Sequence, residues 1–80
     1  MFLEITTPDK TIFEGEVQLV ELPGSKGRFE ILKNHAPIIS TLEQGTLRTV
    51  KTDGEELLFN IDGGVVENKS NKIVVLVESA

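Results

Sequence analysis

The sequence contains no cysteine, tryptophan or tyrosine, and it has a single histidine, His35. Without cysteine there is no disulfide framework and no thiolate for catalysis or metal binding. Metal sites usually need three or four converging ligands, which one histidine does not supply. The missing Tyr and Trp side chains are the platforms on which many proteins stack nucleic-acid bases. We therefore expect no metal, no other cofactor and no nucleic-acid partner.

Basic residues are few and dispersed, and long apolar runs are missing. The chain carries a formal net charge of −5, and its eight Lys and Arg residues are scattered from Lys10 to Lys72. Nucleic-acid binding would require these charges on one face. No apolar run approaches the roughly 20 residues of a membrane span, and the N-terminus lacks the basic and apolar regions of a signal peptide. We expect an acidic, non-secreted domain covering residues 1–80.

What the sequence does contain is short strand patterns separated by turn residues. Apolar and polar residues alternate in most segments, and no segment shows helical spacing. This predicts an all-β fold, either a sandwich or a barrel. Strands are expected at residues 2–6, 11–14, 16–22, 28–32, 45–51, 55–61, 65–67 and 72–78, while residues 38–42 fit strand or coil.

Three local patterns carry further predictions. Val17 and Leu19 alternate out of phase with Val20, so segment 16–22 contains a β-bulge or has both faces covered. Asp53-Gly54 predicts a two-residue hairpin turn with positive φ at both residues. Gly63-Gly64 predicts a bulge or a sharp bend between strands.

The last strand is apolar on both faces. Ile73, Val75 and Val77 form one face, while Val74 and Leu76 form another that is nearly as apolar, and Leu58 likewise lies opposite its apolar neighbours. Either these strands are covered on both sides, or Val74, Leu76 and Leu58 form a docking face for a partner.

Residues that could carry catalysis are sparse. Ser25 lies in a Gly-Ser-Lys-Gly turn, but the G-x-S-x-G elbow and its strand–turn–helix context are missing. The same turn lacks the glycine spacing and the Lys-Ser/Thr ending of a phosphate-binding loop. The carboxylates are dispersed, so no acid–base pair is evident. The sequence therefore argues against an enzyme and against a nucleotide site.

Five ordered motifs give the chain a family resemblance. They are residues 7–17 (TPDKTIFEGEV), 22–32 (LPGSKGRFEIL), 34–39 (NHAPII), 42–45 (LEQG) and 63–67 (GGVVE). In this order they resemble the N-terminal domain of the epsilon subunit of bacterial F-type ATP synthases, called delta in mitochondria. The resemblance covers nearly the whole chain. It implies a single β-sandwich, which with the strand pattern gives about 8–10 short strands.

The resemblance also implies a role in the central stalk. Such a domain is a non-catalytic rotor subunit that links the gamma subunit to the polar loops of the membrane c-ring and supports ion-driven ATP synthesis. It would lie peripherally on the cytoplasmic face of the bacterial membrane. The implied c-ring contact comprises Ser25, Lys26, Gly27, Arg28 and Phe29. The implied gamma contact comprises His35, Ala36, Pro37, Ile38 and Ser40.

The chain departs from the family pattern in three ways. Glu30 stands where the family usually has glycine, and it would be strained if that position required positive φ. Arg28 stands where relatives often carry an acidic residue. A basic c-ring loop would repel it, so the loop of this chain's own partner is expected to differ to match. The chain ends at Ser79-Ala80, about where longer relatives begin a pair of inhibitory helices, so neither helix-mediated braking nor ATP binding is expected.

Two other functions compete with the stalk subunit. One is a stand-alone β-sandwich module that binds a peptide or a small ligand in an apolar groove. The other is a small hydrolase that uses Ser25 and His35, although no third residue that would orient the histidine is evident.

Overall fold

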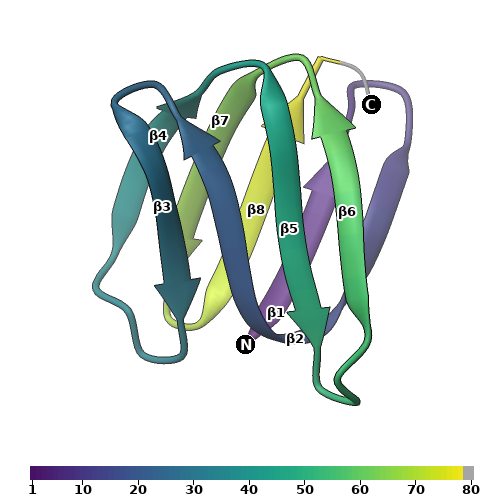
Figure 1. Cartoon of the computed structure of the whole chain (residues 1–80), viewed down its shortest axis with the longest axis vertical. Coiled ribbons are helices and arrows are strands. Elements are labelled where there is room, and N and C mark those ends of the chain that lie inside the picture. Colours follow the sequence, from purple (N-terminus) through teal and green to yellow (C-terminus); the bar gives the residue numbers. More distant parts are fainter. Residues whose placement is uncertain (79–80) are drawn as a thin grey trace.

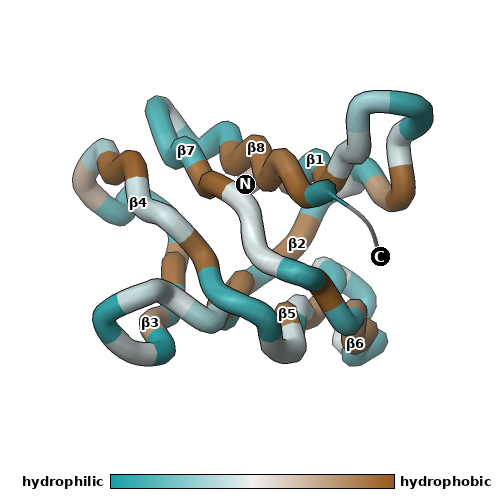
Figure 2. Tube along the Cα trace, turned by 90° about the horizontal axis from the view of Figure 1, so that it is seen from above, coloured by the Kyte–Doolittle hydropathy of each residue, from teal (hydrophilic) through white to brown (hydrophobic). Residues whose placement is uncertain are grey.

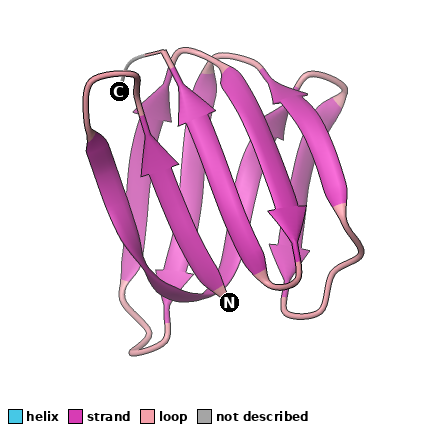
Figure 3. Cartoon of the chain, turned by 180° about the vertical axis from the view of Figure 1, so that it is seen from behind, coloured by secondary structure: helices cyan, strands magenta, loops and turns pink. Residues whose placement is uncertain are grey.

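The computed structural model describes residues 1–78 and shows eight strands (Figure 1). Their bounds are β1 Phe2–Thr6, β2 Thr11–Gly24, β3 Gly27–Leu32, β4 Ile38–Leu42, β5 Gly45–Lys51, β6 Glu56–Ile61, β7 Gly64–Lys69 and β8 Lys72–Val77. The described residues form no helix (Figure 3), and so none that could cross a membrane. Residues 79 and 80, where the domain is expected to end, lie outside the described residues.

The strands form two layers, which confirms the predicted all-β sandwich. Figure 2 shows β7, β8 and β1 on one side and β3, β5 and β6 on the other. β4 pairs with β7, so it extends the first layer. The long strand β2 joins the two layers, because its first half pairs with β1 and its second half with β3 and β5.

β2 corrects two of the predicted strand bounds. The sequence predicts one strand ending before Gly15 and a second from Glu16, but a single strand continues through both residues. Pairing of Gly15 with Leu3 of β1 keeps the glycine extended. The ladder with β5 shifts register between Val17 and Leu19, so the predicted bulge is confirmed. The shift lets both Val17 and Val20 point inward, where they are buried.

The hairpin turns also differ from the prediction. Gly54 has a φ of 92°, but Asp53 does not have positive φ, so the predicted two-residue turn is wrong. Lys51 accepts a bond from the Gly54 N–H at 2.9 Å and donates to the Glu55 carbonyl at 2.8 Å. This is a three-residue loop with glycine in the left-handed position. In the β7–β8 hairpin, by contrast, both turn residues, Ser70 and Asn71, have positive φ.

The core lies between the layers and is aliphatic. Its buried members are Leu3, Ile5, Val17, Val20, Leu22, Ile31, Leu42, Leu47, Ile61, Val66, Ile73, Val75 and Val77. The buried hydroxyl of Thr49 donates to the Leu19 carbonyl at 2.7 Å, so it is satisfied. As predicted, Gly63 and Gly64 form the sharp bend between β6 and β7, both with positive φ.

The outer faces of the two layers carry exposed apolar side chains. Leu76 is 55% exposed and Leu58 is 62% exposed, so the prediction that both sides of these strands are covered is wrong within the chain. Leu76 pairs with Val65 in one layer, whereas Leu58 pairs with Arg48 in the other. The two leucines therefore lie on opposite outer faces. Leu58 does not belong to one patch with Val74 and Leu76.

Candidate docking surfaces

The turn between β2 and β3 is held by a close glycine pair at its base and by hydrogen bonds to Thr41 of β4. Gly24 and Gly27 face each other across the ladder, with Ser25 and Lys26 at the tip. A Cβ on Gly24 would lie 2.6 Å from the Gly27 carbonyl oxygen, so only glycine permits this close turn. The Ser25 N–H donates to the Thr41 carbonyl at 3.1 Å, and the Thr41 hydroxyl donates to Ser25 Oγ at 2.9 Å. The tip is thereby attached to β4.

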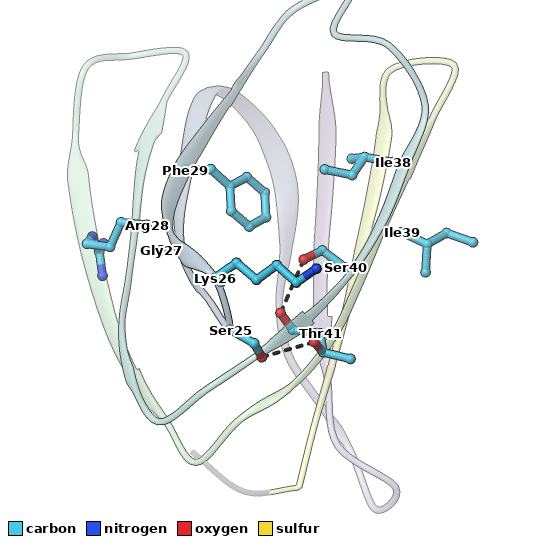
Figure 4. Close-up of a pocket in the computed structure, with 10 residues that line it drawn as sticks. Ser25, Lys26, Gly27, Arg28, Phe29, Ile38, Ile39, Ser40 and Thr41 are labelled. Atoms are coloured by element: carbon cyan, nitrogen blue, oxygen red, sulfur yellow. Dashed lines mark hydrogen bonds between the residues drawn. The ribbon is translucent and has the colours of Figure 1, made fainter.

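A groove of about 630 Å³ lies between this turn, β3 and β4 (Figure 4). Its lining residues are Gly24, Ser25, Lys26, Gly27, Arg28, Phe29, Ile38, Ile39, Ser40 and Thr41. We call it the β3/β4 groove. β3 pairs only with β2, while β4 pairs fully with β7 and touches β2 only where Leu42 meets Gly24. The groove therefore separates two largely open strand edges.

The groove brings together residues that the sequence analysis assigned to separate partners. It contains all five residues of the expected c-ring contact, together with Ile38 and Ser40 of the expected gamma contact. His35, Ala36 and Pro37 do not line it. Ile39 and Thr41 also line the groove, although neither was among the predicted contact residues. Their position in the strand between assigned residues was the available signal, and Ile39 is 73% exposed.

Arg28 makes its contacts within the domain. Its Nη2 lies 2.8 Å from Glu21 Oε1, its Nε donates to the same oxygen at 3.1 Å, and its Nη1 donates to the Thr46 carbonyl at 2.8 Å. In Figure 4 the side chain points away from the other labelled groove residues. Lys26 makes no hydrogen bond or ion pair through its side chain within residues 1–78. The free cation at the tip is therefore Lys26.

A charged network continues from Arg28 across the outer face of β2 and β5. Glu21 also lies 3.8 Å from Arg48, which in turn pairs with Glu56. The hydrogen bond to Glu56 is the main reason that the pKa of Arg48 is raised further above its ordinary value. Glu30 faces Glu21 in the ladder and does not have positive φ, so the condition under which it would be strained is not met. Glu30 instead contributes a negative charge to this face.

His35 lies in the loop that follows β3. Its N–H donates to the Leu32 carbonyl at 3.1 Å, and its ring Nδ1 lies 2.7 Å from the Ala36 carbonyl. The six residues of β3, about 20 Å of extended chain at 3.3 Å per residue, separate this loop from the Ser25 turn. The hydrolase hypothesis is therefore wrong, because Ser25 and His35 lie at opposite ends of a strand.

The described residues offer a groove and exposed strand edges as contact surfaces. Among residues 1–78 no three His, Cys, Asp or Glu side chains converge as metal ligands would. The fold and the groove place the chain among small β-sandwich domains with exposed strand edges. Over residues 1–80 it matches the family model described as ATP synthase, Delta/Epsilon chain, beta-sandwich domain, and it belongs to that family.

Sequence relatives agree with this family. The chain is 43% identical over 76 residues to the ATP synthase epsilon chain of Chlorobium limicola, covering 95% of this chain and 86% of that protein. It is 40% identical over 76 residues to the epsilon chain of Dichelobacter nodosus, covering 95% of this chain but only 53% of that protein. The chain thus spans about half the length of some relatives and most of others.

Solved structures share the fold. A chain in the cryo-EM structure of the Euglena gracilis mitochondrial ATP synthase (OSCP/F1/c-ring, rotational state 1) superposes with a TM-score of 0.89 at 22% identity. The match covers 96% of this chain and 49% of that one. A chain in the central stalk/c-ring structure of the Tetrahymena thermophila mitochondrial ATP synthase gives a TM-score of 0.78 at 16% identity, covering 95% and 61%. At these identities the likeness shows the fold alone.

Proposed function

We propose that this protein is a non-catalytic rotor subunit in the central stalk of an F-type ATP synthase. It links the gamma subunit to the c-ring and supports ion-driven ATP synthesis. The observation that carries the proposal is the family match over all 80 residues, which the relatives named epsilon chain support. In a bacterium the subunit would lie at the cytoplasmic face of the membrane, held there by its partners.

The two contacts divide the surface as follows. Ser25–Phe29, at the tip of the β2–β3 turn, contact the polar loops of the c-ring. His35–Ser40 contact gamma, with His35, Ala36 and Pro37 reaching it from the loop and Ile38 and Ser40 from the rim of the groove. Lys26 supports the first assignment, because its side chain is exposed and has no partner within the described residues.

Binding to the cognate gamma subunit tests this function directly. We expect the purified chain to capture gamma at micromolar concentration and the pair to join the c-ring. Lys26→Glu should weaken the step with the c-ring while gamma binding is retained, because charge complementarity at a contact governs association. No capture of gamma at micromolar concentration would contradict the proposal.

A stand-alone peptide-binding module is the second candidate. The observation that favours it is the β3/β4 groove, since an extended peptide can add to an open strand edge through main-chain hydrogen bonds. The domain alone, without gamma, would then bind an extended peptide from a random library. If it binds gamma and no such peptide, the stalk function stands.

A further inference from the structure

Among residues 1–78, the residues other than glycine that have positive φ all lie at one end of the folded domain. They are Asn34 (66°), Ser70 (52°) and Asn71 (62°). Asn34 lies in the loop after β3, whereas Ser70 and Asn71 form the tight turn between β7 and β8. Residues other than glycine adopt this conformation at a free-energy cost, and such costs cluster at functional sites.

The two strained segments hold each other through a pair of hydrogen bonds. The Asn34 N–H donates to Asn71 Oδ1 at 2.7 Å, and Asn71 Nδ2 donates to Asn34 Oδ1 at 3.0 Å. We call this pair the amide latch. The latch joins loop 33–37 to hairpin 69–72, although the two asparagines are 37 residues apart in the sequence.

A third asparagine, Asn68, also holds this loop through hydrogen bonds to its backbone. Asn68 is 2% exposed, and its Nδ2 donates to the carbonyls of His35 and Ala36 at 3.4 and 3.3 Å. Its Oδ1 is buried and has no hydrogen-bond partner among residues 1–78. Leaving a buried acceptor unpaired costs free energy. The fold therefore accepts backbone strain and a polar burial cost at this end, where hydrogen bonds from Asn68 and Asn71 hold loop 33–37.

The same end gathers exposed lysines. Lys33 precedes Asn34, Lys72 follows Asn71, and Lys69 faces Lys72 across the ladder. All three are exposed, and none makes an ion pair within residues 1–78. Two like charges in facing positions are unfavourable for the hairpin by itself. We call this surface, loop 33–37 together with hairpin 69–72, the basic end.

The basic end contrasts with the rest of the molecule. The chain has a net charge of −5, whereas the Asp, Glu, Lys and Arg residues of loop 33–37 and hairpin 69–72 are all lysines. The connections at the opposite end hold both signs, including Asp9, Lys10 and Lys26. A surface with the opposite sign to the whole molecule orients the domain as it approaches a charged partner. A partner face rich in carboxylates would pair these lysines and relieve their mutual repulsion.

We propose that the basic end is a preformed docking surface for a carboxylate-rich face of a protein partner, and that the amide latch holds it in shape. The inference rests on the proposed function only in naming that partner as the gamma subunit. Lys33, Lys69 and Lys72 supply the charge. Asn34, Asn68 and Asn71 are positioning residues, because they act on the loop rather than on the partner.

The charge is tested by affinity for gamma at two salt concentrations. Lys72→Gln should weaken binding about three- to tenfold at low salt, and the difference should shrink at high salt, because ions screen exposed charges. The matched control is Lys10→Gln, which removes an exposed, unpaired lysine at the opposite end and should change affinity less than about twofold. Neither substitution touches the core, so both variants should fold.

The latch is tested by Asn71→Gly. Glycine accepts the positive φ, so the hairpin is retained while both latch bonds are lost. We expect faster hydrogen exchange at the Asn34 N–H and a roughly two- to tenfold weaker affinity for gamma, because an unlatched loop must be ordered on binding.

The outcomes separate this inference from the proposed function. If the wild-type chain does not bind gamma, the proposed function fails and the named partner fails with it. If the wild type binds gamma but Lys72→Gln behaves like Lys10→Gln at both salt concentrations, only the docking surface is overturned. Faster exchange at Asn34 with unchanged affinity would overturn the role of the latch. Weaker association with the c-ring in place of gamma would overturn the choice of partner.

Discussion

At the scale of single residues, Gly64 is the position least able to accept a side chain. Its φ is 151°, and a Cβ there would overlap the carbonyl oxygen of Leu76 in the neighbouring strand. We expect Gly64→Ala to lower the free energy of unfolding by more than about 3 kcal/mol, because neither backbone can move without breaking the ladder.

Gly54 provides the control for this substitution. It also has positive φ, at 92°, but nothing lies within 4 Å of its Cβ position. Gly54→Ala should therefore lose only the conformational term, about 1 kcal/mol. Urea unfolding of the two variants measures the difference, and equal losses would contradict the steric argument.

Lys51 gives a prediction for alkaline pH. Its hydrogen bond to Glu55, followed by the charges of Asp53 and Glu55, raises its pKa above the ordinary lysine value of about 10.4. Because the folded-state pKa is the higher one, Lys51 stabilises the fold below about pH 10.4, and this contribution is lost as pH rises through the folded pKa. NMR titration of the Lys51 side chain should show a raised midpoint that falls in Glu55→Gln. An unchanged midpoint in that variant would contradict the assignment to Glu55.

At the scale of elements, Arg28 joins three strands. From β3 it binds Glu21 of β2 and the Thr46 carbonyl of β5. We expect Arg28→Glu to lower the free energy of unfolding by about 1–2 kcal/mol, since it removes these bonds and adds a carboxylate beside Glu21 and Glu30. Arg28→Gln should lose less, because the partners are partly exposed and solvent screens the lost charge. Equal losses in urea unfolding would show that the added charge is harmless.

Arg28→Glu also bears on how the c-ring contact is tested. A loss of c-ring association in this variant would mix a lost contact with a loosened β3. Lys26→Glu avoids the ambiguity, since Lys26 has no partner inside the described domain. The family resemblance assigned Arg28 to the c-ring contact, but the ladder that places Glu21 beside it could not be predicted from local pattern.

Local patterns were sufficient for most strands but not for their connections. Alternation identified β1, β3, β5, β6 and β8 closely, because one face of each is buried. It found only three of the six residues of β7, and it left β4 open between strand and coil. The full length of β2 was not predicted, because glycine in a local pattern signals the end of a strand. In the structure, pairing with Leu3 keeps the strand continuous through Gly15. The turn at Asp53-Gly54 was assigned the wrong type, because loop closure at Glu55, rather than the dipeptide, determines the geometry. Ser70-Asn71 forms the two-residue turn with a weaker sequence signal.

The groove and the latch depend on topology and could not be predicted from spacing. The β3/β4 groove exists because β4 crosses to the far layer and leaves the edge of β3 open. The latch joins Asn34 to Asn71, and no local rule pairs residues so distant in sequence. Asparagine in two turns was the only signal, since this residue tolerates positive φ.

At the scale of the whole molecule, the outer face of β7 and β8 has little role in stability. Leu76 is largely exposed and adjoins Val65, whereas its neighbour Val75 is fully buried. We expect Leu76→Thr to change the free energy of unfolding by less than about 0.5 kcal/mol. Val75→Thr should lower it by about 1–3 kcal/mol, because it buries a hydroxyl. A comparable loss in Leu76→Thr would mean that this face packs against something within the domain.

The parallel pairing of β1 with β8 constrains the order of assembly. Leu3 lies opposite Ile73, so the first strand completes its pairing only with the last one. While the protein is being synthesised, β1 can pair with β2 alone until the ribosome has delivered residues 72–77. A ladder between such distant segments is slow to form, because the chain between them must first lose its freedom. The newborn chain therefore holds an open β1 edge from the time β1 emerges until β8 follows, and its risk of aggregation through that edge is greatest in this interval.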